Sequence, residues 1–235
     1  MSPFSHFTIE FDNKKTAFAI RDVPPDANPA AVLEALQLPP FTGVITTLVG
    51  ASSMLPEIVD ATRQLFTLGL APVAEELRLL VVDGGSTVGG MLAMGDARQA
   101  IGGTFPLVGV CPFGAVVIPD HLDSSHSHFV LVDGDRFGDE SVLLPGLLRG
   151  SDTPGVSILV DMHVTSRILP HELPLHAQWA DILIAVRHSG GAADAVLDPN
   201  SDVYKLLPAN TTIMAVDLDQ PEALAALLRQ VFVPH

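Results

Sequence analysis

From residue 42 onward, short apolar runs alternate with segments whose apolar residues recur at the spacing of an α-helix. The runs contain few polar positions, so both faces of each predicted strand are expected to be buried. They lie at residues 44–49, 79–82, 107–111, 129–132, 156–160, 182–186 and 212–216. Helices are predicted between them, at residues 56–68, 88–100, 192–197 and 221–232, with a weaker one at 140–149 that Pro145 and Gly146 interrupt.

Buried strands that alternate with helices are typical of a parallel sheet covered on both faces. We therefore predict an α/β protein with a Rossmann-like, doubly wound, mostly parallel sheet and helices on both faces. Residues 113–128 form the longest stretch without clear periodicity. Loops of that length are usually functional or disordered.

The first forty residues follow a different pattern. The segments FTIEF and TAFAIRDV alternate around Asn13, Lys14 and Lys15, which predicts a β-hairpin. Asn28 and Pro29 then provide a capping residue and a first-turn proline for a helix. We expect residues 1–41 to be an accessory hairpin and helix, and residues 42–235 to be the Rossmann-like domain.

The amino-acid composition disfavours nucleic acids and membranes as binding partners of the chain. The chain has 27 acidic and 12 basic residues, and a formal net charge of −15 repels a nucleic-acid backbone. No apolar stretch approaches the ~18 residues that a membrane span needs. The single cysteine, Cys111, cannot form an internal disulfide. We expect a cytoplasmic protein that binds neither nucleic acid nor membrane.

The strongest local signal is a glycine-rich loop between the strand at 79–82 and the helix that starts near Gly89. Glycines allow a sharp turn and close approach to a ligand, and a helix N-terminus presents N–H groups to an anion. The spacing is neither GxGxxG nor a Walker loop, which disfavours dinucleotide dehydrogenases and P-loop NTPases. A tight turn without a ligand is the alternative. The candidate ligand-binding residues here are Asp83, Gly84, Gly85, Ser86, Thr87 and Gly89, and the two hydroxyl residues could instead cap the helix.

Other loops follow predicted strands and should meet the glycine-rich loop at the same edge of the sheet. Open α/β folds bind their ligands at the carboxyl ends of parallel strands, so we expect a shared pocket there. The candidate residues in these loops are Gly50, Ala51, Ser52, Pro112, Phe113, Gly114, Ser189, Gly190 and Gly191.

Polar residues also gather beside the strand at 129–132. His126 and His128 lie on one side of the chain if the segment is extended, and with Asp123 they could hold a divalent metal. No third ligand has a convincing spacing, so positioning a ligand or the loop is favoured. Glu140 could bind ribose hydroxyl groups, act as an acid or base, or favour a helix N-terminus.

Several sequence blocks, in this order, resemble the SLOG superfamily, and most closely its subgroup related to the ligand-sensing region of TRPM channels (LSDAT) in its standalone prokaryotic form. The blocks are LVGASSM, LLVVDGGSTVGGMLAMGDA, LVGVCPFGAVVIPD, LDSSHSHFVLVDGDRFGDES and ADILIAVRHSGGAAD, within residues 42–198. The resemblance implies a Rossmann-like domain that binds a nucleotide-derived ligand such as ADP-ribose, cyclic ADP-ribose, a related NAD product or a cyclic nucleotide.

By this resemblance, residues 84–87 hold phosphate, residues 189–191 complete the phosphate side, and the loops at 50–52 and 112–114 surround the rest with His126 and Glu140. Ala51 replaces a glycine that relatives often have, and Gly191 replaces a common arginine, so affinity or ligand identity can differ. The cytokinin-activating phosphoribohydrolases of the superfamily carry PGGxGTxxE, which is absent here. That activity is not supported.

We therefore expect a ligand sensor without a strong catalytic signature, whose bound state is detected by a separate effector protein or within a homo-oligomer. The sequence leaves open whether Mg²⁺ accompanies the phosphate groups of the ligand. The alternative is a hydrolase that cleaves an N-glycosidic or phosphoester bond, with Glu140 or Asp139 as acid or base and His126 in support. An assembly module with a vestigial pocket is the third hypothesis.

Overall fold

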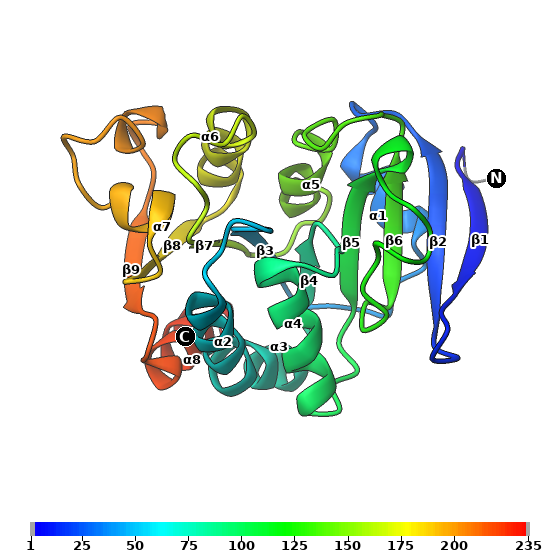
Figure 1. The fold of residues 1–235 in the computed structure, drawn as a ribbon, viewed down its shortest axis with the longest axis horizontal. Coiled ribbons are helices and arrows are strands. Elements are labelled where there is room, and N and C mark those ends of the chain that lie inside the picture. The colour runs from blue at the N-terminus through cyan, green and yellow to red at the C-terminus, as the bar shows by residue number, and fades with distance from the viewer. Residues whose placement is uncertain (1–2, 234–235) are drawn as a thin grey trace.

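The computed structural model describes residues 3–233 and is organised around one β-sheet (Figure 1). The described strands follow the order β1-β2-β6-β5-β4-β3-β7-β8-β9 across the sheet. All neighbouring strands are parallel except β1 and β2. Their bounds are β1 Ser5–Glu10, β2 Thr16–Val23, β3 Val44–Val49, β4 Leu80–Asp83, β5 Leu107–Pro112, β6 His128–Val132, β7 Gly155–Val160, β8 Ile182–Arg187 and β9 Ile213–Asp217.

The central strands are buried along their whole length, as their continuous apolar character predicts. Every residue of β3, β4, β5 and β7 is buried. The chain adds β4, β5 and β6 on one side of β3 and then returns to add β7, β8 and β9 on the other. The order of a doubly wound fold therefore reverses between β3 and β7, which confirms the predicted fold class.

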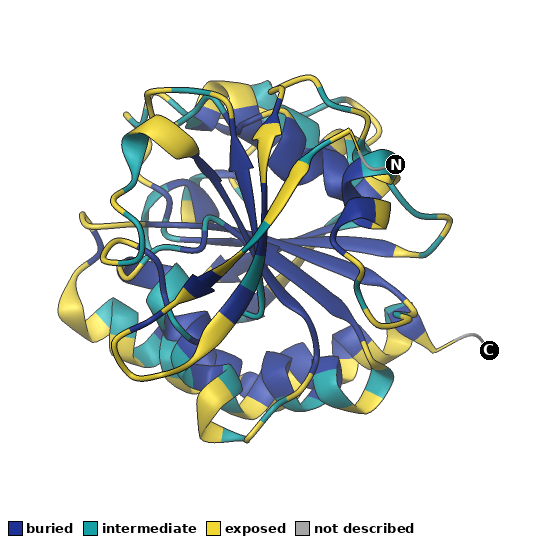
Figure 2. Ribbon diagram, turned by 90° about the vertical axis from the view of Figure 1, so that its right-hand side faces the viewer, coloured by how far each residue is buried: buried dark blue, intermediate teal, exposed yellow. Residues whose placement is uncertain are grey.

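Helices cover both faces of the sheet (Figures 1 and 2). One face carries α2 Pro56–Leu65, α3 Ala71–Leu77, α4 Gly89–Ala100 and α8 Pro221–Phe232, and the other carries α1 Pro29–Ala35, α5 Leu143–Gly146, α6 Leu169–Trp179 and α7 Gly191–Ala195. Within residues 3–233, no helix is long and apolar enough to cross a membrane.

Prolines explain why the sequence analysis missed two helices. Two helices, α3 and α6, were not predicted, because each has proline near its start and α6 also has Pro174 in its interior. Proline fits the first turn of a helix, so Pro72 and Pro170 lie at the starts of α3 and α6. The helix predicted at 56–68 continues instead as a π-helical turn, Phe66–Leu70, that leads into α3.

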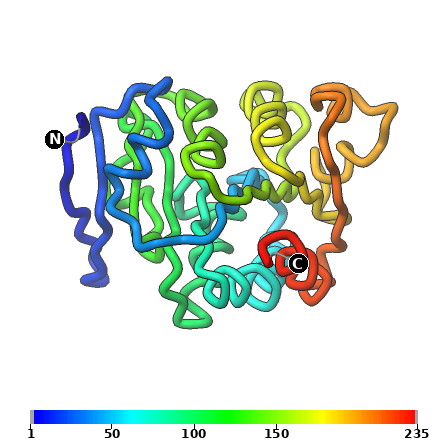
Figure 3. The backbone as a smooth tube through the Cα atoms, turned by 180° about the vertical axis from the view of Figure 1, so that it is seen from behind, coloured from blue at the N-terminus to red at the C-terminus, as the bar shows by residue number. Residues whose placement is uncertain are grey.

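The N-terminal hairpin extends the main sheet. β2 pairs in parallel with β6, so β1 becomes the edge strand at one end of the molecule (Figure 3). Lys14 takes the left-handed conformation at the turn, with φ 65°. Asn28 caps α1 by accepting a hydrogen bond of 2.9 Å from the N–H of Ala30. The predicted hairpin and helix are both present.

The long segment at residues 113–128 covers the sheet beyond α4. Its apolar side chains Val116, Ile118 and Leu122 pack with Cys111 and Phe129 beside the hairpin. This segment packs on residues of β1, β2, β5 and β6, and these apolar contacts hold it in place. Residues 121–123 then pair with the loop that follows β4, where the N–H of Thr87 donates to the carbonyl of His121 and Leu122 lies opposite Ser86.

The π-helical turn provides a test of the core. Phe66 is fully buried where α2 meets α3, among residues of the α4 and α8 layer. We expect Phe66→Ala to lower the free energy of unfolding by about 3–5 kcal/mol in urea denaturation, because it leaves a cavity. Phe113→Ala is the matched control: Phe113 is 43% exposed, and its removal should change stability by about 0.5 kcal/mol or less. Equal losses in both variants would contradict the assigned packing.

Candidate functional site

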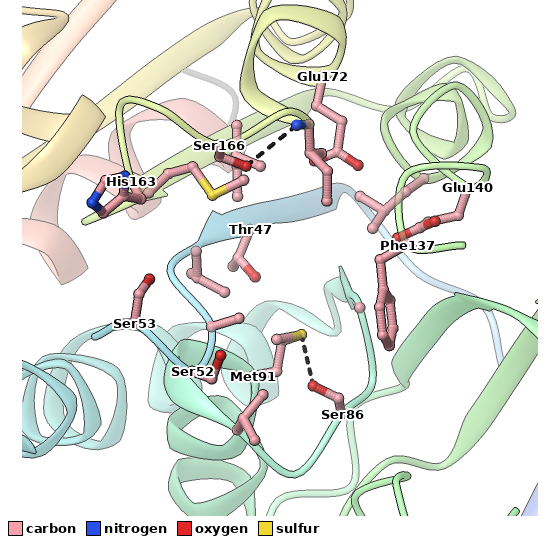
Figure 4. A pocket seen from close by; sticks show the side chains of 18 of the residues that line it. Thr47, Ser52, Ser53, Ser86, Met91, Phe137, Glu140, His163, Ser166 and Glu172 are labelled. Atoms are coloured by element: carbon pink, nitrogen blue, oxygen red, sulfur yellow. Dashed lines mark hydrogen bonds between the residues drawn. The ribbon is translucent and has the colours of Figure 1, made fainter. Parts of the chain in front are cut away.

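A cavity of about 470 Å³ lies at the carboxyl edge of the sheet, above β3 and between the loops that follow β4 and β7 (Figure 4). Since β3 leads into α2 on one face and β7 leads into α6 on the other, these loops diverge and leave a crevice at the switch point. Its size is that of a small-molecule site. The wall consists of Thr47, Leu48, Val49, Ala51, Ser52, Ser53, Gly84, Ser86, Val88, Met91, Phe137, Glu140, Leu144, Met162, His163, Thr165, Ser166, Ile168 and Glu172.

Hydrogen-bond donors line the side of the cavity next to α2 and α4. The hydroxyl groups of Ser52, Ser53 and Ser86 belong to this side. Within residues 3–233, the backbone N–H groups of these three serines donate to no protein acceptor. Backbone donors of this kind bind anionic oxygens without a charged side chain.

Glycine brings the start of α4 onto the loop after β3. Gly89 has φ +56°, and a Cβ at this position would overlap the carbonyl oxygen of Gly50. The N–H of Gly90 donates to the same carbonyl oxygen at 3.0 Å. Val88 is the N-cap, and it provides no side-chain cap. The alternative prediction that Ser86 or Thr87 caps this helix is therefore wrong.

The glycine-rich loop rests on a buried polar cluster. Asp83 Oδ1 accepts a hydrogen bond of 2.6 Å from the N–H of Gly85 and lies 2.8 Å from His126 Nε2. The other imidazole nitrogen, Nδ1, lies 3.0 Å from Asp123 Oδ2, and the N–H of Asp123 donates to the carbonyl of Gly85. His126 therefore supports the loop from below, outside the cavity wall.

The two carboxylates decide the charge of this imidazole. Burial alone would lower the pKa of His126, but Asp83 and Asp123 outweigh that effect and raise it to about 9. At neutral pH an imidazolium thus joins the two carboxylates. Because each group is buried, removal of one would leave an uncompensated charge.

Two carboxyl groups lie on the opposite side of the cavity. Glu140, which follows β6, accepts a hydrogen bond of 2.7 Å from the N–H of Gly138, and Glu172 projects from α6. Burial and the proximity of Glu140 raise the pKa of Glu172 to about 8, and burial also raises the pKa of Glu140. The pair can therefore hold a proton at neutral pH.

The structure brings Ala51, Ser52, Gly84, Ser86 and Glu140 together in one wall. Other predicted site residues contact that wall from outside. Gly50 accepts a hydrogen bond from the start of α4, and Asp83 and Gly85 form the buried base of the loop.

The turn after β5 lies apart from the cavity wall. The N–H of Gly114 donates to the carbonyl of Gly134 at 2.8 Å, and Phe113 is exposed to solvent. Pro112, the last residue of β5, is paired with Val132 of β6. This turn therefore contacts the segment that leads toward Glu140.

The loop after β8 supports the turn after β7. Ser189 Oγ accepts a hydrogen bond of 3.0 Å from the N–H of Asp161. A Cβ on Gly191 would come within 2.5 Å of the carbonyl oxygen of Met162, while one on Gly190 would approach the carboxylate of Asp161. These residues therefore contact the backbone of the turn after β7 and lie outside the cavity wall, whereas Met162 of that turn lines the cavity.

The two histidines near β6 have different surroundings. His126 lies in a turn in which its N–H donates to the carbonyl of Asp123, so the segment is not extended there and the condition for placing His126 and His128 on one side is not met. His128 begins β6, where its Nδ1 lies 2.8 Å from the Ser127 hydroxyl and its ring packs against Phe18. Among residues 3–233, no group of three or more His, Cys, Asp or Glu side chains is arranged to hold a metal ion.

Sequence reasoning missed the part of the wall that the second half of the chain provides. Glu172 lies on α6, which was not predicted, and His163, Thr165 and Ser166 lie in the turn that precedes that helix. The position of the segment DMHVTS could have revealed these residues, because it directly follows a buried strand, as the other candidate loops do. Phe137, which is 57% exposed, lies beside the polar run that includes Glu140.

The imidazolium cluster predicts a pH dependence of stability. Because the folded-state pKa of His126 is raised from 6.5 to about 9, its stabilisation is fully present below pH 6.5 and is lost as pH rises through about 9. Wild-type protein should lose unfolding free energy over this window in urea denaturation, and His126→Gln should lose less. His171→Gln, at an exposed position on α6, is the control. Identical pH profiles for all three proteins would contradict the assigned charge.

Comparison with known proteins identifies the family and supports the fold. Residues 43–226 match the family described as "SLOG in TRPM, prokaryote". The X-ray structure of TM1055 matches with a TM-score of 0.54 and 19% sequence identity, over 80% of this chain and 99% of that chain, a likeness that shows the fold alone. No curated protein sequence matches. The family match covers most of the chain, which therefore belongs to the prokaryotic family of SLOG domains related to those of TRPM proteins.

Proposed function

We propose that the cavity binds a nucleotide-derived ligand of the ADP-ribose class and that the protein is a ligand sensor. Membership of the SLOG family supports a domain that binds or processes a nucleotide-related ligand. The observation that carries the proposal is the cavity at the switch point, where the glycine-rich loop and the loop after β3 converge. Cyclic ADP-ribose and related NAD products belong to the same class.

The phosphate groups of the ligand bind on the side formed by Ser52, Ser53 and Ser86. Among the described residues, the cavity wall contains no Lys or Arg, so hydroxyl groups, backbone N–H groups and the N-terminus of α4 supply the attraction. This arrangement suits a protein with a net charge of −15, because the donors act at short range.

Apolar side chains provide room for the rest of the ligand. Val49, Met91 and Met162 line the cavity, and the exposed ring of Phe137 adds an aromatic surface on which a base can stack. A cavity of about 470 Å³ is within the range for ligands of this size. Shape and apolar contact thus supplement the phosphate contacts.

A sensor is favoured because two acid–base groups of the rival hydrolase are engaged elsewhere. His126 is held between two buried carboxylates. Asp139 accepts hydrogen bonds from the N–H groups of Asp135 and Arg136 at 2.9 and 3.1 Å. We further propose that a separate effector protein, or a second copy of the chain, reads the bound state.

One observation favours the hydrolase as the second candidate. Glu140 and Glu172 are buried in the same cavity, and each has a raised pKa. Two carboxyl groups that differ in protonation can act as acid and base on a glycosidic or phosphoester bond.

Thermal unfolding with ADP-ribose, cyclic ADP-ribose, NAD, AMP and cyclic dinucleotides, with and without Mg²⁺, tests the binding proposal. An ADP-ribose-class ligand at a hundredfold excess over Kd should stabilise the fold by about 2.7 kcal/mol. Ser86→Ala should weaken binding roughly tenfold, since a hydrogen bond to a charged group contributes about 1.5–3 kcal/mol. Ser5→Ala, on the exposed edge strand, should bind as wild type does. Absence of any shift in wild type would refute nucleotide binding.

Turnover separates the sensor from the hydrolase. The stabilising ligand should be recovered intact by chromatography after long incubation with wild-type protein. If wild type converts the ligand and Glu140→Gln binds it without conversion, the hydrolase replaces the sensor.

A further inference from the structure

The two buried carboxyl groups lie on the opposite side of the cavity from the serine donors. Ser52 and Ser86 belong to loops that lead into α2 and α4, on one face of the sheet. Glu172 projects from α6 on the other face, and Glu140 lies just before α5 on that same face (Figure 4). The cavity therefore has a donor-rich end and a carboxyl end, joined across the end of β3.

Neither carboxyl group has a cation as a partner among the residues of the wall. Glu140 is 7% exposed and Glu172 is 5% exposed. The other titratable wall residue is His163, and Asp139 next to Glu140 binds backbone amides. His176, also on α6, is uncharged because burial lowers its pKa to about 3.

This environment makes one of the two carboxyl groups a hydrogen-bond donor at neutral pH. Burial, with the charge of Glu140 nearby, raises the pKa of Glu172 to about 8. A protonated carboxyl donates, and an ionised one accepts. The vicinal hydroxyl groups of a ribose both donate and accept, so they match this pair, whereas a phosphate ester carries a charge of about −1.5 to −2 that the pair repels.

We propose that Glu140 and Glu172 form a hydroxyl-binding end of the cavity, which accepts the free hydroxyl groups of one ribose of the ligand and excludes a ligand in which one of those hydroxyl groups is esterified with phosphate. The inference rests on the proposed function, because it assumes an ADP-ribose-class ligand. It adds that the protein uses buried charge to discriminate between a ribose whose ring hydroxyl groups are free and one in which such a hydroxyl group carries a phosphate.

The test is isothermal titration calorimetry at pH 7 with ADP-ribose, ADP-ribose 2′-phosphate and ADP-ribose 1″-phosphate, which place the additional phosphate on one ribose or the other. Wild type should bind ADP-ribose roughly tenfold more tightly than at least one ester, a difference of about 1.4 kcal/mol. The variant with both Glu140→Gln and Glu172→Gln keeps the side-chain shape and should reduce that difference to about threefold or less. Glu222→Gln, on the exposed side of α8, should leave it unchanged.

Each result has one meaning. If wild type does not bind ADP-ribose, the proposed function fails and the inference fails with it. If wild type binds both esters as tightly as ADP-ribose, or if the double variant keeps the discrimination, only the inference is wrong. The thermal stability of each single variant, Glu140→Gln and Glu172→Gln, shows whether the fold is retained, and discrimination measured in a folded single variant decides the question if the double variant does not fold.

Discussion

The hydrogen bonds of the Asp83 carboxylate hold the candidate site together. Asp83 ends β4 in the fully buried centre of the sheet, and its Oδ1 atom meets both the N–H of Gly85 and the imidazole of His126. Asp123 completes the cluster from the far side of the ring. Since buried charges are tolerated only when they are paired, this cluster fixes the shape of the loop that carries Ser86.

Close backbone contacts at glycine residues connect this loop to the rest of the cavity wall. Gly85 has φ +70° and lies so close to Gly109 of β5 that a side chain at either position would displace backbone. Gly89 and Gly90 then bring the start of α4 against the loop after β3. The donors of two different loops therefore share one side of the cavity.

The sequence predicts the sheet well because the central strands are buried on both faces and are therefore continuously apolar. It also identifies the loops that should meet at the carboxyl edge, since that meeting follows from parallel strands. It does not reveal α6, whose prolines resemble a loop, and so Glu172 could not be placed beside Glu140. Nor does it distinguish a histidine that lines a cavity from one that supports a loop, as His126 does, because that distinction depends on long-range contacts with Asp83.

A crystal structure of the protein with ADP-ribose would show directly whether the ligand binds in the cavity and which way it lies. We expect phosphate oxygens at about 2.7–3.2 Å from the backbone nitrogens of the loops at Ser52 and Ser86. A ribose should face Glu140 and Glu172. A ligand bound outside the cavity, or one whose phosphate groups face the carboxyl pair, would contradict the proposed binding mode.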